Sequence, residues 1–366
     1  MSGSAVKFTT SAPTDRKLPW PNTAGCLRSG GSRYGGRPQA ITLRALAAMF
    51  MRHAKGHYRK RGQPTSELDL YRRLLRRLVK TFGSITATEF GPLKLRRFRQ
   101  GMIDDGWTRK SINNQISRVR HVFAWAVGEE LVPAATLVAL QKVAGLQADR
   151  SDAAEPEPIQ PVAEADVNAV LPHVSRQVAD MVRVQLLTGC RPGEVCAIRP
   201  VDVDRTGDVW TYVPASHKTE HHGKQRTIFV GPRAQAILLP YLDRADDAYC
   251  FSPLDAEAAR HAEQRANRKT PVQPSQRNRK KSQPSRSVGD QYTRDSYRRA
   301  IERGCKAAGI DNWSPNRLRH SRLTDLERQY DLELSSIVAG HSTLKTTMIY
   351  VQRDEARARA AMAEVG

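Results

Sequence analysis

The sequence predicts a mainly α-helical protein of two domains that carries one small β-hairpin. Apolar residues recur at helical spacing from residue 41 to about residue 145. An acidic, proline-rich stretch, QADRSDAAEPEPIQPV at residues 147–162, then interrupts that pattern. Further along, two short segments of alternating apolar and polar residues, DVWTYVP and RTIFV, stand on either side of a polar turn.

The first domain is expected to follow a flexible arm. Residues 1–40 mix Pro, Gly and Ser with isolated basic residues and show no periodicity that could bury a face. Four or five helical patterns follow, at residues 41–54, 68–82, 90–103, 111–127 and 134–143. We therefore predict an all-α domain over residues 41–146. Residues 147–162 cannot continue a helix and are predicted to be the interdomain linker.

The second domain, residues 163–366, opens with a helical pattern that delivers Arg191 on the following turn. Glu194, three residues on, is either an orienting partner for Arg191 or a first-turn acid that satisfies the helix start. The polar turn of the hairpin, SHKTEHHGKQ, carries Lys218 near one end, with Lys224 as its rival.

Residues 253–291 resemble an insertion in the second domain. Between residues 260 and 286 there are nine Lys or Arg and one acidic residue, interspersed with Ser, Gln and Pro. The first half, AEAARHAEQRANRK, is predicted to be helical. The rest is expected to be disordered alone and to order on DNA.

Charge makes nucleic acid the expected partner. The 366 residues include 59 Lys or Arg and 37 Asp or Glu, a net charge of +22, which indicates a protein that binds a polyanion. Residues 41–150 alone contain 21 Lys or Arg and 8 Asp or Glu.

A basic cluster in the first domain is predicted to bind DNA. The cluster lies opposite a leucine stripe and consists of Arg72, Arg73, Arg76, Arg77 and Lys80. Like charges at positions i and i+4 repel one another, and phosphate groups relieve that repulsion. The alternative is a solvated helix face with no ligand.

Composition also sets the expected compartment and cofactors. No apolar run approaches the roughly eighteen residues of a membrane-spanning helix, and the first residues lack a secretory apolar region. Five scattered cysteines argue against a disulfide framework, so we expect a cytoplasmic protein. His217, His221 and His222 are interpreted as a polar hairpin tip, not as metal ligands. We expect no metal and no cofactor, because the chain shows no Walker loop, acidic metal cluster or dinucleotide fingerprint.

The stretch from Ser314 to Gln352 holds the residues best suited to chemistry. Ser314 and Pro315 form a helix-start pattern, which places Arg319 and His320 on the first turns of a helix. Leu334, Ile337 and Val338 predict a second short helix that Gly340 ends, with His341 in the turn after it. Ser342 or Thr343 then caps a third predicted helix, which carries Tyr350.

A tyrosine beside arginines and histidines suggests covalent attack on a phosphodiester. A phenol with a pKa of about 10 is a weak nucleophile at neutral pH. It needs a neighbouring group that takes its proton. It also needs cations that neutralise the charge of the phosphate. Guanidinium groups suit the second task because they stay charged and present a planar fork to two phosphate oxygens. Arg319 supplies one, and Arg191 is the candidate for the other.

These motifs resemble, in order, those of the tyrosine recombinases, or phage-type integrases. Arg191 stands in TGCRPGEV, Lys218 in HKTEHHGKQRTIFV, Arg319 in RLRHS, and His341 with Tyr350 in GHSTLKTTMIY. The resemblance covers about residues 160–360 by motif, and the helical region before them more weakly. It implies an all-α core-binding domain followed by an α+β catalytic domain that clamp a DNA duplex together.

The resemblance also implies a function and a site. The function is site-specific DNA recombination or integration for a mobile element, by cleavage and rejoining of strands through a 3′-phosphotyrosine on Tyr350. Arg191, Arg319 and His341 would stabilise the charge of the transition state, and Lys218 would protonate the departing 5′ oxygen. The family acts without metal or nucleotide. Its members associate on double-stranded DNA, so we expect a tetramer there.

One position departs from the family pattern. Asn316 stands where the family usually has His, three residues before the second arginine. Asn can donate a hydrogen bond to a phosphate oxygen but cannot exchange protons, so we expect an altered rate with the same reaction. Two alternatives are a topoisomerase-like enzyme that nicks and rejoins DNA, and a catalytically impaired DNA-binding regulatory factor.

Overall fold

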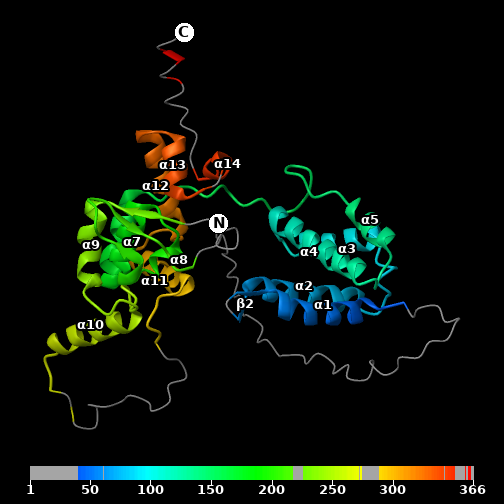
Figure 1. Cartoon of the computed structure of the whole chain (residues 1–366), viewed down its shortest axis with the longest axis horizontal. Helices are drawn as coiled ribbons and strands as arrows, with labels where there is room; N and C mark the ends of the chain where they lie inside the picture. The colour runs from blue at the N-terminus through cyan, green and yellow to red at the C-terminus, as the bar shows by residue number, and fades with distance from the viewer. Residues whose placement is uncertain are drawn as a thin grey trace, which may run out of the picture. The chain divides into compact units, whose positions relative to one another are not determined.

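The computed structural model divides into two compact units, Met1–Glu157 and Pro158–Gly366. The two units are drawn together in Figure 1. The structure describes residues 40–60, 62–216, 226–271, 273, 288–341, 343–350, 359 and 362–363. The division between the units falls within the stretch predicted as a linker, residues 147–162. The predicted N-terminal arm lies almost entirely outside the described residues.

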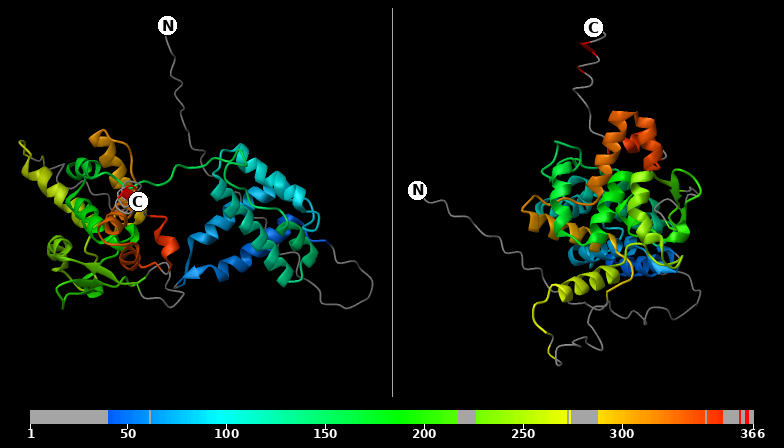
Figure 2. Two further views of the ribbon diagram at one scale, coloured as in Figure 1. Left: turned by 90° about the horizontal axis from the view of Figure 1, so that it is seen from above. Right: turned by 90° about the vertical axis from the view of Figure 1, so that its left-hand side faces the viewer.

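The N-terminal unit is a bundle of five helices (Figures 1 and 2), as the sequence predicts. The helices are α1 (Leu43–His57), α2 (Ser66–Phe82), α3 (Pro92–Asp104), α4 (Arg109–Gly128) and α5 (Ala134–Gln141). The hydroxyls of Thr42 and Thr108 cap α1 and α4 by accepting first-turn N–H groups. Helix α1 packs against α2 and α4, and buried apolar residues of all five helices form one core.

The N-terminal unit also contains a small β-ribbon that the sequence did not predict. Strands β1 (Arg59–Lys60) and β2 (Gln63–Pro64) pair antiparallel between α1 and α2. Each strand has two exposed residues, which is too short for an alternating pattern to appear.

The C-terminal unit is mainly helical and contains one small sheet. Its helices are α6 (Glu164–Val170), α7 (Arg176–Thr188), α8 (Pro192–Val195), α9 (Pro232–Leu242), α10 (Pro253–Ala266), α11 (Arg294–Ala308), α12 (Asn316–Gln329), α13 (Leu332–Ala339) and α14 (Leu344–Thr347). Two 3₁₀ turns cover Leu171–His173 and Pro200–Asp202. Helix α7 packs against α9, α11 and α12 at the centre of the unit (Figure 1).

The predicted hairpin is confirmed as two strands of a three-stranded antiparallel sheet. The strands β3 (Val203–Asp204), β4 (Trp210–Tyr212) and β5 (Ile228–Val230) pair in that order, with Trp210 opposite Val230. The tip, residues 217–225, lies outside the described residues, and so do Lys218, Lys224 and the three histidines of that turn.

The predicted helix in the insertion is also present. Helix α10 buries none of its residues fully, although Ala256 packs against the core of the unit. Most of the basic remainder of the insertion, residues 274–287, lies outside the described part of the chain. No helix among the described residues is long and apolar enough to cross a membrane.

Gln185 joins four segments in the core of the C-terminal unit. The amide Nε2 of this fully buried residue of α7 donates to the carbonyl oxygens of Cys190, at 3.2 Å, and Pro315, at 2.9 Å. Its Oε1 accepts a hydrogen bond of 3.0 Å from the hydroxyl of Tyr297 on α11. One side chain therefore fixes the segments that precede Arg191 and Arg319 relative to each other.

Replacing Gln185 by Leu should destabilise the protein far more than removing only the Tyr297 hydroxyl. Gln185→Leu leaves the Cys190 carbonyl and the Tyr297 hydroxyl buried without partners, each costing about 1–3 kcal/mol, whereas the Pro315 carbonyl keeps the N–H of Leu318. We expect the free energy of unfolding to fall by about 3–5 kcal/mol, against about 1 kcal/mol for Tyr297→Phe. Urea unfolding of both variants measures the difference, and equal losses would contradict the role assigned to Gln185.

Candidate active site around Arg319 and Tyr350

Arg319 is buried at the centre of the site. It lies on α12, which begins at Asn316, after the predicted start at Ser314 and Pro315; the carbonyl of Ser314 accepts the N–H of Arg317 instead. The Arg319 side chain has no exposed surface. Its Nη1 donates to Gly189 O at 2.6 Å and its Nη2 to Ala339 O at 2.7 Å. Burial, with Arg191 and Arg226 nearby, lowers the pKa of Arg319 to about 10, so it remains charged at neutral pH.

Two glycines in the left-handed conformation bring these carbonyls to Arg319. Gly189 ends α7 with φ of +65°, and Gly340 ends α13 with φ of +63°. Side chains with a Cβ are strained in that conformation, so glycine is favoured at both helix ends. The predicted end of the second short helix at Gly340 is confirmed. Each turn also places a polar residue, Arg191 or His341, within two positions of the glycine.

Arg191 is held by Glu194, and both alternatives for this acid prove correct. The Nη1 of Arg191 donates to Glu194 Oε1 at 2.8 Å, while its backbone N–H donates to Oε2 at 2.7 Å, as at a capped helix start. Glu194 is buried, and burial alone would raise its pKa. The charges of Arg226 and Arg191 outweigh burial, so its pKa is lowered and it stays ionised.

His341 is present as a neutral imidazole. Its Nε2 lies 3.0 Å from Nη2 of Arg319, which can only donate, so Nε2 accepts. Its Nδ1 lies 2.9 Å from the hydroxyl of Thr347 and therefore carries the proton that it donates. Burial and the charges of Arg319, Arg191 and Arg226 lower the pKa of His341 to about 4. The imidazole thus orients Arg319 without adding a charge.

Tyr350 lies against the same residues, although not on a helix. Helix α14 ends at Thr347, so the prediction that Tyr350 lies within the third helix is wrong. Helix α14 consists of one helical turn. Tyr350 lies in the chain reversal after it, where the Tyr350 N–H donates to the Thr347 carbonyl. The Tyr350 ring centroid is 5.1 Å from that of His341, and Cζ of Arg319 lies 5.4 Å from it.

His320 and Thr324 of α12 hold Tyr350 from the other side. The ring centroids of His320 and Tyr350 are 4.5 Å apart, and the Thr324 hydroxyl donates to the Tyr350 carbonyl at 3.2 Å. Burial and the charge of Arg319 lower the pKa of His320 to about 4. Tyr350 also packs on a small apolar cluster of Leu323, Leu326 and Ala339, separate from the main core of the unit.

His320 lies on the first turns of α12 as the sequence predicts, without a predicted role, and no sequence pattern pointed to Arg226. Arg226 opens the RTIFV segment, where a basic residue beside a polar turn is usually exposed. In the structure it is 4% exposed and borders Glu194. No local pattern marks this burial, because the groups that cover Arg226 come from distant segments.

The basic cluster predicted to bind DNA divides into two sets on α2. Arg73, Arg76 and Lys80 are exposed, with no ion pair among the described residues. Arg72 pairs with Asp69. Arg77 pairs with Asp105, donates to the Gly101 carbonyl at 2.6 Å, and lies over the ring of Trp107.

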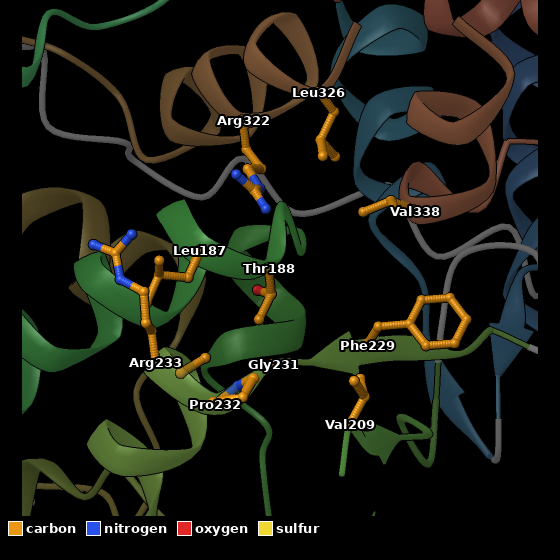
Figure 3. Close-up of a pocket in the computed structure, with 11 residues that line it drawn as sticks. Leu187, Thr188, Val209, Phe229, Gly231, Pro232, Arg233, Arg322, Leu326 and Val338 are labelled. Carbon is orange, nitrogen blue, oxygen red and sulfur yellow. The ribbon is translucent and has the colours of Figure 1, made fainter. Parts of the chain in front are cut away.

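The C-terminal unit also contains a pocket of about 300 Å³ (Figure 3). Its walls are mainly apolar and include Leu187, Val209, Phe229, Leu326 and Val338, with Arg322 at one side. It borders the site, because Leu326 also belongs to the apolar cluster on which Tyr350 packs and the Val338 carbonyl accepts from Arg226. The chemistry of the C-terminal unit is therefore concentrated at the arginine, histidine and tyrosine cluster.

Comparisons with known proteins agree with this fold. A model of the phage integrase family matches residues 163–357, more than half of the chain. The chain belongs to the phage integrase family, as the motifs predict. The tyrosine recombinase XerD of Pseudomonas putida is 27% identical over 264 residues, which cover 70% of this chain and 75% of that protein. XerC of Corynebacterium glutamicum is 36% identical over 63 residues, 17% of this chain and 20% of that protein.

Solved structures share the fold. A lambda integrase dimer bound to a COC′ core site matches with a TM-score of 0.60 and 12% identity, over 85% of this chain and 77% of that one. The Tn1549 transposon integrase in complex with circular intermediate DNA matches with a TM-score of 0.57 and 18% identity, over 88% of this chain and 99% of that one. The predicted fold class, a helical domain followed by an α+β domain, is confirmed.

Acidification should destabilise the protein through His320 and His341. Both are neutral in the folded state with a pKa of about 4, whereas an unfolded histidine titrates near 6.5. Between these values the unfolded chain binds more protons, so stability falls as the pH falls. We expect about 2 kcal/mol to be lost per histidine between pH 7 and pH 4.5.

Urea unfolding at pH 7 and pH 4.5 measures this loss. His320→Gln should remove about half of the pH-dependent part, because one of the two imidazoles no longer titrates. His261→Gln, at a half-exposed histidine on α10, is the control and should leave the pH dependence unchanged. A pH response that survives intact in His320→Gln would contradict the assignment.

Proposed function

We propose that the protein is a site-specific DNA recombinase that cuts and rejoins strands through a covalent bond between Tyr350 and a 3′ phosphate. The observation that carries this proposal is the contact of the Tyr350 ring with Arg319, His341 and His320 of the same chain. Membership of the phage integrase family supports it.

Each residue of the cluster suits one requirement of phosphoryl transfer. Arg191 and Arg319 neutralise the phosphate, because both guanidinium groups lie close enough to His341 for their charges to lower its pKa. Their hydrogen bonds to Glu194 and to two carbonyls orient the guanidinium groups in advance, which avoids reorganisation during the reaction. Asn316, at the start of α12, replaces the usual histidine. His341 is then the imidazole that both bonds to Arg319 and lies against the Tyr350 ring.

The proposed cleavage step forms one bond and breaks one. The Tyr350 phenolic oxygen attacks phosphorus, and its proton passes to Nε2 of His341 as Nη2 of Arg319 turns from that nitrogen to the phosphate. The bond between phosphorus and the 5′ oxygen breaks, and Lys218 gives the departing oxygen a proton, with Lys224 as the rival donor. The phosphotyrosine keeps the energy of the phosphodiester. A 5′ hydroxyl from another strand can then reverse the step and complete the exchange.

Assembly on DNA follows from the same proposal. A lambda integrase tetramer bound to a Holliday junction shares the fold, with a TM-score of 0.60 and 12% identity. We propose that this chain likewise assembles on double-stranded DNA, since exchange of two duplexes needs four cleavages. The substrate is the recombination site of a mobile element.

The alternatives receive less support. A regulatory factor without activity has no need for the intact network that links Arg319, His341 and Thr347. A topoisomerase-like enzyme would share the covalent step but would rejoin the original strands, so recombination of two marked duplexes distinguishes it.

Removing the Tyr350 hydroxyl should abolish the covalent complex while leaving folding and DNA binding nearly intact. In Tyr350→Phe the ring still packs on His320 and the apolar cluster, but no oxygen can attack phosphorus. Incubation with a nicked duplex that traps the intermediate, followed by denaturation and peptide mapping, measures the complex. Tyr330→Phe, at a 60% exposed tyrosine, is the matched control and should trap DNA as the wild type does.

A phosphotyrosine on any other residue, or undiminished trapping by Tyr350→Phe, would refute the mechanism. Undiminished trapping together with loss in Tyr330→Phe would move the nucleophile to the end of α12.

DNA affinity should depend on the exposed cations of α2. Replacing Arg73, Arg76 and Lys80 with Gln removes three candidate phosphate contacts. We therefore expect the slope of log affinity against log salt to become shallower by about 2–3. The matched control replaces three exposed cations of α1, Arg44, Arg52 and Lys55. Binding isotherms between 50 and 200 mM salt measure both slopes, and an equal change in the two variants would remove the α2 face from the proposed interface.

A further inference from the structure

We propose that Arg226 is a positioning residue of this site, which ties the Arg191–Glu194 pair to the turn that presents His341. This inference rests on the function proposed above. It assigns a task to a buried charge that the cleavage step does not use directly.

Arg226 makes contacts in three separate segments. Its Nη1 donates to Val338 O, near the end of α13, at 3.0 Å and to Thr227 O at 3.1 Å. Its Nε lies 3.5 Å from Glu194 Oε1, the oxygen that also accepts from Arg191. Arg226 is also the first described residue after the hairpin tip that carries Lys218. One side chain thus joins the hairpin, the start of α8 and the end of α13.

The turn at Gly340 is built closely around this guanidinium. A Cβ placed on Gly340 would lie 2.4 Å from Nη1 of Arg226 and 3.0 Å from its Cδ. Such a separation is far inside van der Waals contact. The glycine is therefore needed for two reasons, its positive φ and the approach of Arg226. His341 follows directly, so the position of the imidazole depends on how Arg226 packs.

The charge of Arg226 also matters to the site. Three guanidinium groups, from Arg191, Arg226 and Arg319, surround a neutral His341, and one carboxylate, Glu194, opposes them. The described groups therefore carry a net charge of +2. A phosphodiester carries one negative charge and the five-coordinate transition state carries two, so this excess favours the transition state.

The unsatisfied donors of Arg226 support a functional reason for its burial. Its Nε and Nη2 are buried without hydrogen-bond partners among the described residues. Such groups cost stability, and a buried charge costs more, so an apolar residue would stabilise the fold better. The need to hold Arg191 and Glu194 in fixed positions gives a reason for an arginine at residue 226.

Single-turnover cleavage of a nicked trapping duplex by the full chain tests the inference. We compare wild type, Arg226→Met, Arg226→Lys and a control, Arg244→Met. Arg244 likewise donates to a carbonyl, of Tyr249 at 2.6 Å, and pairs with Asp255, but it lies outside the site. Arg226→Met should bind DNA within about twofold of wild type but cleave about 100-fold more slowly, as expected for loss of transition-state stabilisation. Lysine should restore part of the rate, and Arg244→Met should cleave like wild type.

The pH profile separates positioning from a loss of folded protein. Besides Arg226, the charged groups that face His341 are Arg319 and Arg191, and all three lower its pKa. In Arg226→Met the pKa of His341 should rise, so the acid limb of the cleavage rate should move to higher pH. A smaller burst of complex with an unchanged rate and profile would overturn the inference, as would an equal loss in Arg244→Met.

A stability cycle decides the inference even if wild type forms no covalent complex, an outcome that would overturn the proposed function itself. Gly340→Ala should lower the melting temperature by roughly 5 °C in wild type. In Arg226→Ala it should do so by less than half as much, because only the cost of the positive φ remains. Equal shifts in the two backgrounds would show that Arg226 does not pack on the turn.

Discussion

Burial of the Arg319 charge is the constraint on which the rest of the site depends. A guanidinium with no exposed surface needs hydrogen-bond partners, and here two carbonyls and one imidazole accept from its two Nη groups, while its Nε has no partner among the described residues. Those carbonyls belong to Gly189 and Ala339, at the ends of α7 and α13. The positions of both helices are thus linked to one charge, and the two left-handed glycines are the local means by which the chain reaches it.

The same charge explains the protonation of the neighbouring histidines. Burial and Arg319 hold His320 and His341 neutral, which leaves imidazole lone pairs beside Tyr350 at neutral pH. The replacement of the usual histidine by Asn316 removes one imidazole from the start of α12, but two remain in contact with the tyrosine ring. This arrangement is consistent with retained chemistry at an altered rate.

The tyrosine is held less firmly than the arginines. Arg319 lies near the start of α12, and Arg191 and Glu194 lie at the start of α8. Tyr350 instead follows a one-turn helix and packs on the small apolar cluster of Leu323, Leu326 and Ala339. Segments with few buried apolar contacts open at low cost in free energy. A rigid phosphate site and a more easily displaced nucleophile suit a reaction in which the attacking group must be presented to DNA and later released.

Much of this protein is determined by its sequence alone. Helical periodicity, the acidic proline-rich stretch and the alternating strands predict the five-helix bundle, the division of the chain and the hairpin, because these signals are local. The glycine that ends a helix at residue 340 and the motif order likewise point to Arg191, Arg319, His341 and Tyr350. Only the tertiary structure shows that Arg226 and His320 are buried against them, that Arg77 is engaged within its own unit, and that Tyr350 lies beyond its helix. The physical reason is that burial and partner choice depend on segments far apart in the chain, which no local pattern records.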